Sequence, residues 1–363
     1  MRTRTLLATL LIAGTGLPSA AQATDPNRCS VQEPSFCLNG VSNAVTGLDS
    51  LRVALPSGRH EIGEEEERKR DKRAQAQRIV VAAAQNVAGL GAPDPWGLWI
   101  GYGRSKYEST VRIAPYDADL DSYRIGVDRF FGGKYLLGLA LLYEKLDTDT
   151  QYNGGGQDVD GTTVAPYFSW LINDRFSLDV NAGYGWFDAS QKRIDPTGTP
   201  GSPPILRSSY DARRKFVAAT LNSFYPKGDW SLGGRVGYLY SEEKQDGYTE
   251  TGGPSARTVN SRTLRLGQAF VGGDAAYFFG HGLEAYGALI YRYDVSRNDG
   301  RDGGGLPSAV GATQPDDKDE WEWSLGLRFY AQRNVTLSAE YLQTEGRDQF
   351  DNKVWNLLAR FEF

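Results

Sequence analysis

Residues 355–363, WNLLARFEF, decide the fold of this 363-residue chain. Alternate positions are apolar, and polar residues fall between them with a single apolar exception: Trp355, Leu357, Ala359, Phe361 and Phe363 alternate with Asn356, Leu358, Arg360 and Glu362. Successive side chains of a strand point to opposite faces, so the segment has one apolar and one largely polar face. On a soluble sheet such an end would be a sticky edge. In lipid, a closed barrel puts the apolar face outside and leaves no free edge.

The same alternation recurs upstream and predicts twelve strands. The predicted strands are 96–107, 119–131, 133–147, 159–172, 174–189, 210–226, 229–244, 258–279, 282–296, 319–331, 333–345 and 352–363. Aromatic residues gather near the strand ends, as membrane interfaces favour. We therefore expect residues 93–363 to form a twelve-stranded antiparallel outer-membrane β-barrel.

The connections between these segments alternate short and long, which supports the strand count. The short turns are Gly132-Gly133, Asn173-Asp174, Lys227-Gly228, Gly280-His281-Gly282 and Gln332-Arg333. The long polar connections lie near 108–118, 148–158, 190–209, 245–257, 297–318 and 346–351. Outer-membrane barrels have short periplasmic turns and longer external loops, so both ends of the barrel are expected on the periplasmic side.

The amino-terminal residues predict export. Arg2 and Arg4, the apolar stretch LLATLLIAG and the small-residue site Ala21-Gln22-Ala23 are typical of a cleavable signal peptide over 1–23. No other stretch has about 18 consecutive apolar residues, so no membrane helix is expected. The formal charge of −5 becomes −7 when the two signal arginines are removed, which argues against nucleic acid as a partner.

Two segments separate the signal from the barrel. Residues 24–63 are expected to be a periplasmic tether, in which an oxidising compartment favours a Cys29–Cys37 disulfide; a metal site is the weaker alternative. Residues 64–92 begin with acids and continue with bases, which places opposite charges four residues apart and suits the helix dipole. We expect an α-helix there, too charged to face lipid, in the lumen or in the periplasm.

Signal peptide, helix and carboxy-terminal barrel together resemble the autotransporter (type V secretion) β-domain family over residues 64–363. The ending also resembles the signal recognised by the barrel-assembly machinery, and that resemblance gives this role to Trp355, Leu357, Phe361 and Phe363. It further implies a helix in the pore and partners that include outer-membrane lipid, lipopolysaccharide and periplasmic chaperones. The family carries a large passenger before the helix, whereas residues 24–63 leave room for little or none. We expect a monomer.

Other functions remain open from sequence. An enzyme would need a histidine or an activated serine at a rim, and only His60 in the tether and His281 in a short turn are present, so no catalytic activity, cofactor or metal is expected. The acidic run Asp316, Asp317, Asp319 and Glu320 is better explained as a solvated loop than as a Ca²⁺ site. The alternatives are a passive, porin-like solute channel and a surface protein that acts through its loops in adhesion. The inward charged residues, candidates to line a pore, are Arg235, Glu284, Arg292, Arg328, Glu340 and Arg360.

Overall fold

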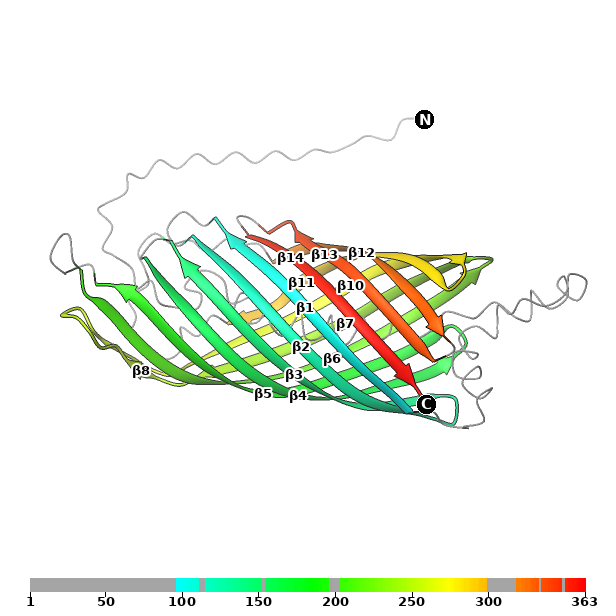
Figure 1. Cartoon of the computed structure of the whole chain (residues 1–363), viewed down its shortest axis with the longest axis horizontal. Helices are drawn as coiled ribbons and strands as arrows, with labels where there is room; N and C mark the ends of the chain where they lie inside the picture. Colours follow the sequence, from blue (N-terminus) through cyan, green and yellow to red (C-terminus); the bar gives the residue numbers. More distant parts are fainter. Residues whose placement is uncertain are drawn as a thin grey trace, which may run out of the picture.

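The chain forms a closed antiparallel barrel of twelve strands (Figure 1). The computed structural model describes residues 96–110, 115–151, 154–195, 197, 203–298, 318–332, 334–347 and 350–363. The predicted signal peptide, tether and helix, residues 1–92, lie outside the described residues. No helix in the described part of the chain is long and apolar enough to cross a membrane.

The strands follow one another around the barrel in chain order. They are β1 (Trp96–Ser109), β2 (Tyr116–Phe131), β3 (Tyr135–Thr150), β4 (Gly155–Asn173), β5 (Phe176–Ile194), β6 (Ile205–Lys227), β7 (Trp230–Gln245), β10 (Arg262–Gly280), β11 (Leu283–Asn298), β12 (Asp319–Gln332), β13 (Val335–Glu345) and β14 (Phe350–Glu362). A small hairpin of β8 (Tyr248–Thr249) and β9 (Thr258–Val259) lies between β7 and β10. The predicted twelve-stranded barrel is thus confirmed.

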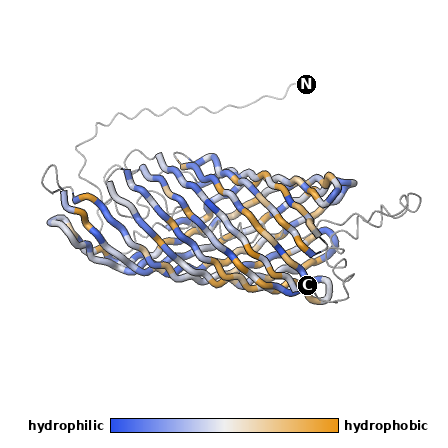
Figure 2. Tube along the Cα trace, viewed as in Figure 1, coloured by the Kyte–Doolittle hydropathy of each residue, from blue (hydrophilic) through white to orange (hydrophobic). Residues whose placement is uncertain are grey.

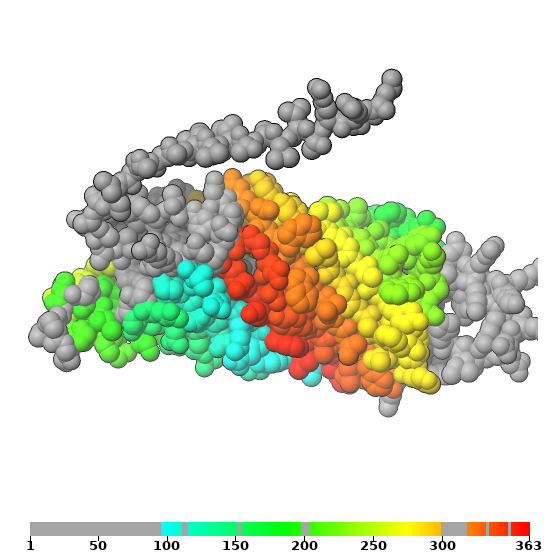
Figure 3. All heavy atoms as spheres, turned by 90° about the horizontal axis from the view of Figure 1, so that it is seen from above, coloured from blue at the N-terminus to red at the C-terminus, as the bar shows by residue number. Residues whose placement is uncertain are grey.

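The first and last strands close the barrel. Their register runs from Gly97 opposite Glu362 to Ser109 opposite Phe350. At the end of the barrel that carries the short turns, Trp96 and Phe363 exchange two backbone hydrogen bonds of 2.9 Å. β1 and β14 lie side by side on the surface in Figure 3, in cyan and red. The aromatic ending is therefore paired along its whole length, and no edge strand is left open.

Burial alternates along each strand as the sequence pattern predicts. On β6, Val217 and Leu221 are exposed while Phe216, Ala218 and Thr220 are buried. The buried side must face the lumen, because buried side chains from non-adjacent strands touch one another. Leu358, the exception to the polar face of 355–363, belongs to an inward cluster with Trp99 and Tyr167. Figure 2 shows hydrophobic residues gathered toward the end of the barrel where the carboxy-terminus lies.

The strands differ from prediction mainly at the end away from the carboxy-terminus. β6 begins at Ile205 rather than 210, and its pairing with β5 continues to Ile194 opposite Ile205. Beyond the apolar band the outward face of a strand need not be apolar, so the sequence alternation that marks its start is lost there. The predicted strand 258–279 begins at Arg262, since Thr258–Val259 is β9 of the small hairpin.

Glycines let inward aromatic rings lie flat on the neighbouring strand. A β-carbon on Gly126 would overlap the indole of Trp99, and one on Gly138 would overlap the ring of Tyr167. The wall therefore packs densely on its inner side although the strands are only one layer thick. The short turns use left-handed residues for a different reason: Gly132, Gly133 and His281 have φ of 55°, 66° and 53°.

Candidate functional site in the barrel lumen

Ion pairs between neighbouring or nearby strands line the lumen. Seven arginines that are nine-tenths or more buried lie on the inner wall or at its mouth: Arg124, Arg193, Arg214, Arg292, Arg328, Arg347 and Arg360. Buried charges in a protein need partners and hydrogen bonds, since removing an ion from water is costly. The following clusters show how the barrel provides them.

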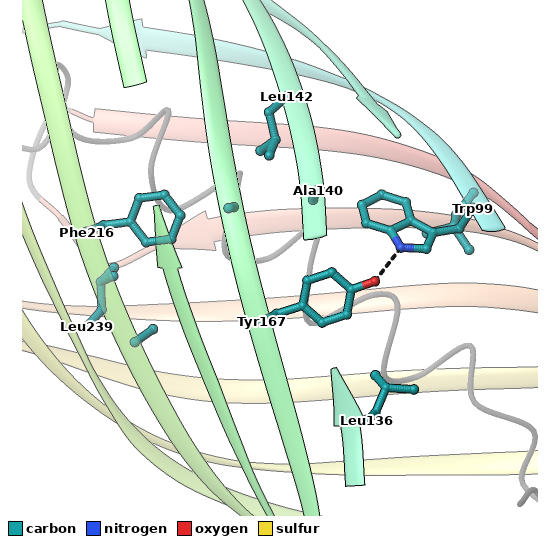
Figure 4. Packing of buried hydrophobic residues seen from close by; sticks show 10 residues of the cluster. Trp99, Leu136, Ala140, Leu142, Tyr167, Phe216 and Leu239 are labelled. Carbon is teal, nitrogen blue, oxygen red and sulfur yellow. Dashed lines mark hydrogen bonds between the residues drawn. The ribbon is translucent and has the colours of Figure 1, made fainter. Parts of the chain in front are cut away.

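A cluster next to the closing seam joins four strands. Arg360 of β14 donates to both carboxylate oxygens of Asp128 of β2, at 2.8 and 2.6 Å, across β1. The hydroxyl of Tyr167 on β4 donates to the same carboxylate at 2.7 Å. The indole nitrogen of Trp99 on β1 donates to that hydroxyl at 2.8 Å, as the dashed line in Figure 4 shows. All four side chains are buried. The network therefore links the last strand, β14, to β1, β2 and β4.

Two further arginines predicted to face inward pair with carboxylates on the next strand. Arg328 of β12 donates to Glu284 of β11, and their positions are directly opposite in the register. Arg292 of β11 forms a bidentate ion pair with Glu322 of β12: its Nε and Nη2 donate to the two carboxylate oxygens at 3.1 and 3.0 Å. Gln268 accepts from Arg292 at 3.4 Å. Each of these charged groups is at most 5% exposed.

The remaining inward candidates are also placed on the inner wall. Arg235 of β7 donates to Asp274 of β10 at 3.0 Å, and its side chain is 9% exposed. Glu340 of β13 is half-buried on the lumen side, where its charge acts on buried Arg124. Arg124 itself donates to the amide oxygen of Asn356 at 3.0 Å. The six predicted residues therefore lie on β7 and on β11 to β14, in one half of the wall. Five of them form ion pairs, Glu340 acts on Arg124 through its charge, and together they form no ring of one sign.

Several charged residues of the lumen were not predicted, although the alternation of their strands places them on the inward face. Arg214 of β6 donates to Glu243 of β7 at 2.9 Å and to Glu144 of β3 at 3.2 Å. The contact with Glu144 joins strands that are not neighbours, so it reaches across the lumen face. Asp128 was missed too, although it follows Val127 in the inward phase of β2.

The hairpin between β7 and β10 is fastened to the inner wall at the external mouth. Arg193 of β5 donates to both oxygens of Glu250 at 2.8 and 2.6 Å, and both side chains are at most 2% exposed. Tyr248 of the hairpin stacks on Tyr210 of β6 with ring centroids 5.3 Å apart. The external loop predicted near 245–257 is therefore partly folded against the barrel.

Asp195, just beyond β5, holds the same loop. It accepts hydrogen bonds from the amide and the hydroxyl of Ser255, at 3.0 and 2.6 Å, and from Thr197. Burial acts to raise the pKa of Asp195, but the hydrogen bonds from Ser255 and Thr197 outweigh it and hold the pKa well below its ordinary value. The ionised form is thus part of the folded loop.

At another point of the mouth, Arg347 accounts for part of the acidic run in the sequence. It binds Asp294 through two contacts of 3.0 Å and Glu320 at 2.5 Å. Burial acts to lower the pKa of Arg347, but the carboxylates of Glu320 and Asp294 raise it above its ordinary value. Asp316 and Asp317 lie outside the described residues. Among those that are described, no group of three or more histidine, cysteine or acidic side chains is arranged to hold a metal ion.

The outer surface carries two belts of aromatic residues with aliphatic side chains between them. Near the turns, Trp230, Tyr277 and Phe279 pack in a row with centroids 4.9 Å apart. At the other level, Trp323, Tyr341 and Trp355 form a row with separations of 5.5 and 4.7 Å. Between Trp355 and Phe363 a strand tilted by ~40° rises about 20 Å along the barrel axis. This rise is close to the height of the apolar band of outer-membrane barrels.

The residues predicted as an assembly signal lie on this membrane-facing surface. Trp355, Leu357, Phe361 and Phe363 are 61%, 53%, 39% and 65% exposed. The other predicted sites are not in the lumen or are not described. His281 occupies the β10–β11 turn. Cys29, Cys37 and His60 lie outside the described residues.

Closed twelve-stranded topology, an apolar outer band between aromatic belts and a charged inner wall define an outer-membrane β-barrel. The chain belongs to the autotransporter β-domain family, whose family model matches residues 98–342. It is an outer-membrane barrel of the autotransporter translocator type.

Solved structures of translocator domains share the fold. The translocator domain of the autotransporter NalP from Neisseria meningitidis has a TM-score of 0.62 and 14% identity, covering 82% of this chain and 98% of that one. The β-domain of the Bordetella autotransporter BrkA has a TM-score of 0.58 and 17% identity, covering 74% of this chain and all of that one (100%). A search among curated proteins found no match.

Proposed function

We propose that this translocator barrel encloses residues 64–92 as a polar helix in its lumen and acts as a plugged barrel rather than as an open solute channel. The observation that carries the proposal is a set of buried luminal donors: Arg124 Nε, Arg328 Nε and Nη2, and Asn356 Nδ2 have no hydrogen-bond acceptor within the described part of the chain. Buried polar atoms are nearly always bonded to protein or ordered water. An occupant rich in carboxylates would satisfy these donors.

The sequence of 64–92 fits that requirement. Glu64, Glu65, Glu66 and Glu67 open it and supply acceptors, and Arg68, Lys69 and Arg70 offer charges that inward acids such as Glu340 attract. A helix of this length is about 40 Å long and would span the barrel. The mixed signs of the wall favour a mixed-charge occupant over a selective ion path.

The rest of the proposal concerns export and partners. Residues 1–23 act as a cleavable signal, the tether carries little or no passenger, and the barrel works as a monomer without catalytic activity. Its partners are outer-membrane lipid and lipopolysaccharide, periplasmic chaperones and the barrel-assembly machinery. Support for these statements comes from the amino-terminal sequence, the aromatic ending and the family.

Planar-bilayer conductance tests the plug. The refolded mature protein is compared with a version that lacks residues 64–90. A full-length protein of low conductance that opens on deletion supports the proposal. Equal and steady conductance in both would overturn it in favour of a porin-like channel with a periplasmic helix. A version with Glu64 to Glu67 all changed to Gln keeps the segment but removes its carboxylates, and it should open intermittently.

A further inference from the structure

The inner face of β3 and β4 is apolar in the half of the barrel that carries the short turns. On β3 the inward residues from Leu136 to Leu142 are leucine, glycine, alanine and leucine, and on β4 Ala165 and Tyr167 continue this surface. Together with residues of β6 and β7 they belong to one buried hydrophobic cluster, which Figure 4 shows from close by. We call the following residues of that cluster the apolar wall: Leu136, Ala140, Leu142, Ala165, Tyr167, Phe216, Ala218 and Leu239.

The strands across the lumen from β3 and β4 carry charges on their inner face. In the closed ring of twelve strands, β11 is six places from β3, and β12 is six places from β4. The inward charged residues of β11 and β12 include two ion pairs between these strands, Arg328 with Glu284 and Arg292 with Glu322. All four side chains are buried. We call them the charged wall, and the lumen therefore has two unlike sides.

The carboxy-terminal part of the proposed luminal helix has two unlike faces as well. Apolar residues recur there at intervals of four, four and three, which is the spacing of one helical face. The residues of this face are Ile79, Ala83, Val87 and Leu90. Arg78 and Gln85 are on the other side of the helix, where Val81 is an apolar exception. A helix turns by about 100° per residue, so positions 83 and 85 point about 200° apart.

The connection to β1 sets the height of this segment in the barrel. Trp96, the first residue of β1, is at the end of the barrel that carries the short turns, five residues after position 90. A helix that ends at this rim has Ala83 about 11 Å above it. Ala140 is five residues after Tyr135, the first residue of β3. For a strand tilted by ~40° this is about 13 Å along the barrel axis. Ala83 and Ala140 are therefore at similar heights.

We propose that the apolar wall docks the apolar face of residues 79–90 and fixes the rotation of the luminal helix, with Ala83 toward β3 and Gln85 toward β11. This inference rests on the proposed function, because it needs residues 64–92 inside the barrel. The fixed rotation takes apolar side chains of both surfaces out of water. The opposite rotation would bury the guanidinium of Arg78 against the apolar wall, and burying a charge without a partner is costly.

Cysteine cross-linking in the full-length mature protein tests this rotation. In a background of Cys29→Ser and Cys37→Ser, Ala83→Cys or Gln85→Cys on the helix is combined with Ala140→Cys or Ala288→Cys on the barrel. The two barrel positions are matched, because Ala288 is in the inward phase of β11, five residues after the first residue of that strand. Heat-modifiable gel mobility shows that each variant is folded.

A short bifunctional thiol reagent should link position 83 to position 140 and position 85 to position 288. The yield of these two links should exceed that of the two exchanged pairs about tenfold or more, because the exchanged pairs need Arg78 on the apolar wall. Ala140→Cys with Ala165→Cys is the positive control, since these residues are directly opposite in the register of β3 and β4. A link in the control shows that the reagent enters the lumen.

The pattern of links separates failure of this inference from failure of the proposed function. Equal yields in all four pairs, or higher yields in the exchanged pairs, would overturn the fixed rotation while the segment remains inside the barrel. No link in any of the four pairs, with the control still linked, would mean that the segment is outside the lumen, and both proposals would then fall.

Discussion

Arg360 of the last strand reaches Asp128 of the second strand directly over Gly97 of the first. Gly97 is the register partner of Asp128 on one side and of Glu362, two residues after Arg360, on the other. The ion pair therefore crosses the seam where the two ends of the chain meet. It can form only after β14 has paired with β1, so it stabilises the closed barrel selectively.

Gly97→Ala should weaken the closed barrel. A β-carbon at this position would overlap both the guanidinium of Arg360 and the carboxylate of Asp128. Overpacking of this kind costs about 1–3 kcal/mol, so the urea midpoint of unfolding should fall. Gly273→Ala on β10 is the control, because its added carbon would lie 3.4 Å from the nearest atom, the carbonyl oxygen of Gly233. Equal midpoints for the two variants would show that the seam tolerates the extra carbon.

Removing one partner of the seam pair should cost more than removing both. Arg360→Met leaves Asp128 buried without its cation, and such a loss typically costs about 3–5 kcal/mol. The double change with Asp128→Leu removes the stranded charge and should recover part of this stability. Unfolding in urea followed by tryptophan fluorescence measures the wild type, the two single variants Arg360→Met and Asp128→Leu, and the double variant. Additive losses in the double variant would mean that the two residues are not energetically coupled.

At the seam the sequence predicts which face a side chain is on but does not predict its ion-pair partner. A period of two residues is enough to place Arg328 and Arg360 inside and Trp355 outside, because alternation is local. The partner of Arg360 lies 232 positions away, and finding it requires the register of barrel closure. Arg328 and Glu284 were both predicted to face inward, yet nothing in the sequence pairs them.

The end of the barrel away from the carboxy-terminus has the weakest sequence signal, for a related reason. The strands β8 and β9 have two residues each, too few to show any period. Glu250 therefore looks like an ordinary loop acid until the fold brings it to Arg193. Above the membrane the outward face is no longer required to be apolar, so Arg207 to Ser209 give no strand signal although they are paired with β5.

The loop fastened by Asp195 should loosen in acid. The pKa of this carboxyl is lowered in the folded state, so its contribution to stability is present above the unfolded pKa, about 3.9, and is lost as the pH falls through the lower folded value. Hydrogen exchange of the segment around Ser255, corrected for intrinsic rates between pH 6 and pH 2, should accelerate below about pH 4. In Asp195→Asn the corrected exchange should be faster at neutral pH and should depend less on pH. A profile unchanged by this substitution would assign the acid sensitivity to other carboxylates.

Phe363 offers a test that separates assembly from membrane burial. Phe363→Asp should reduce the amount of heat-modifiable barrel in the outer membrane, because the terminal aromatic residue is the predicted recognition element. Phe329→Asp is the matched control: it is a membrane-facing phenylalanine, 43% exposed against 65% for Phe363, and lies near the same end of the barrel. An acidic group near the membrane interface costs little, about 1 kcal/mol or less, so burial alone should affect both variants slightly and similarly. A strong defect for Phe363→Asp with near-normal assembly of Phe329→Asp supports recognition of the terminus. Equal defects would mean that Phe363 contributes only as one more apolar residue of the membrane-facing surface.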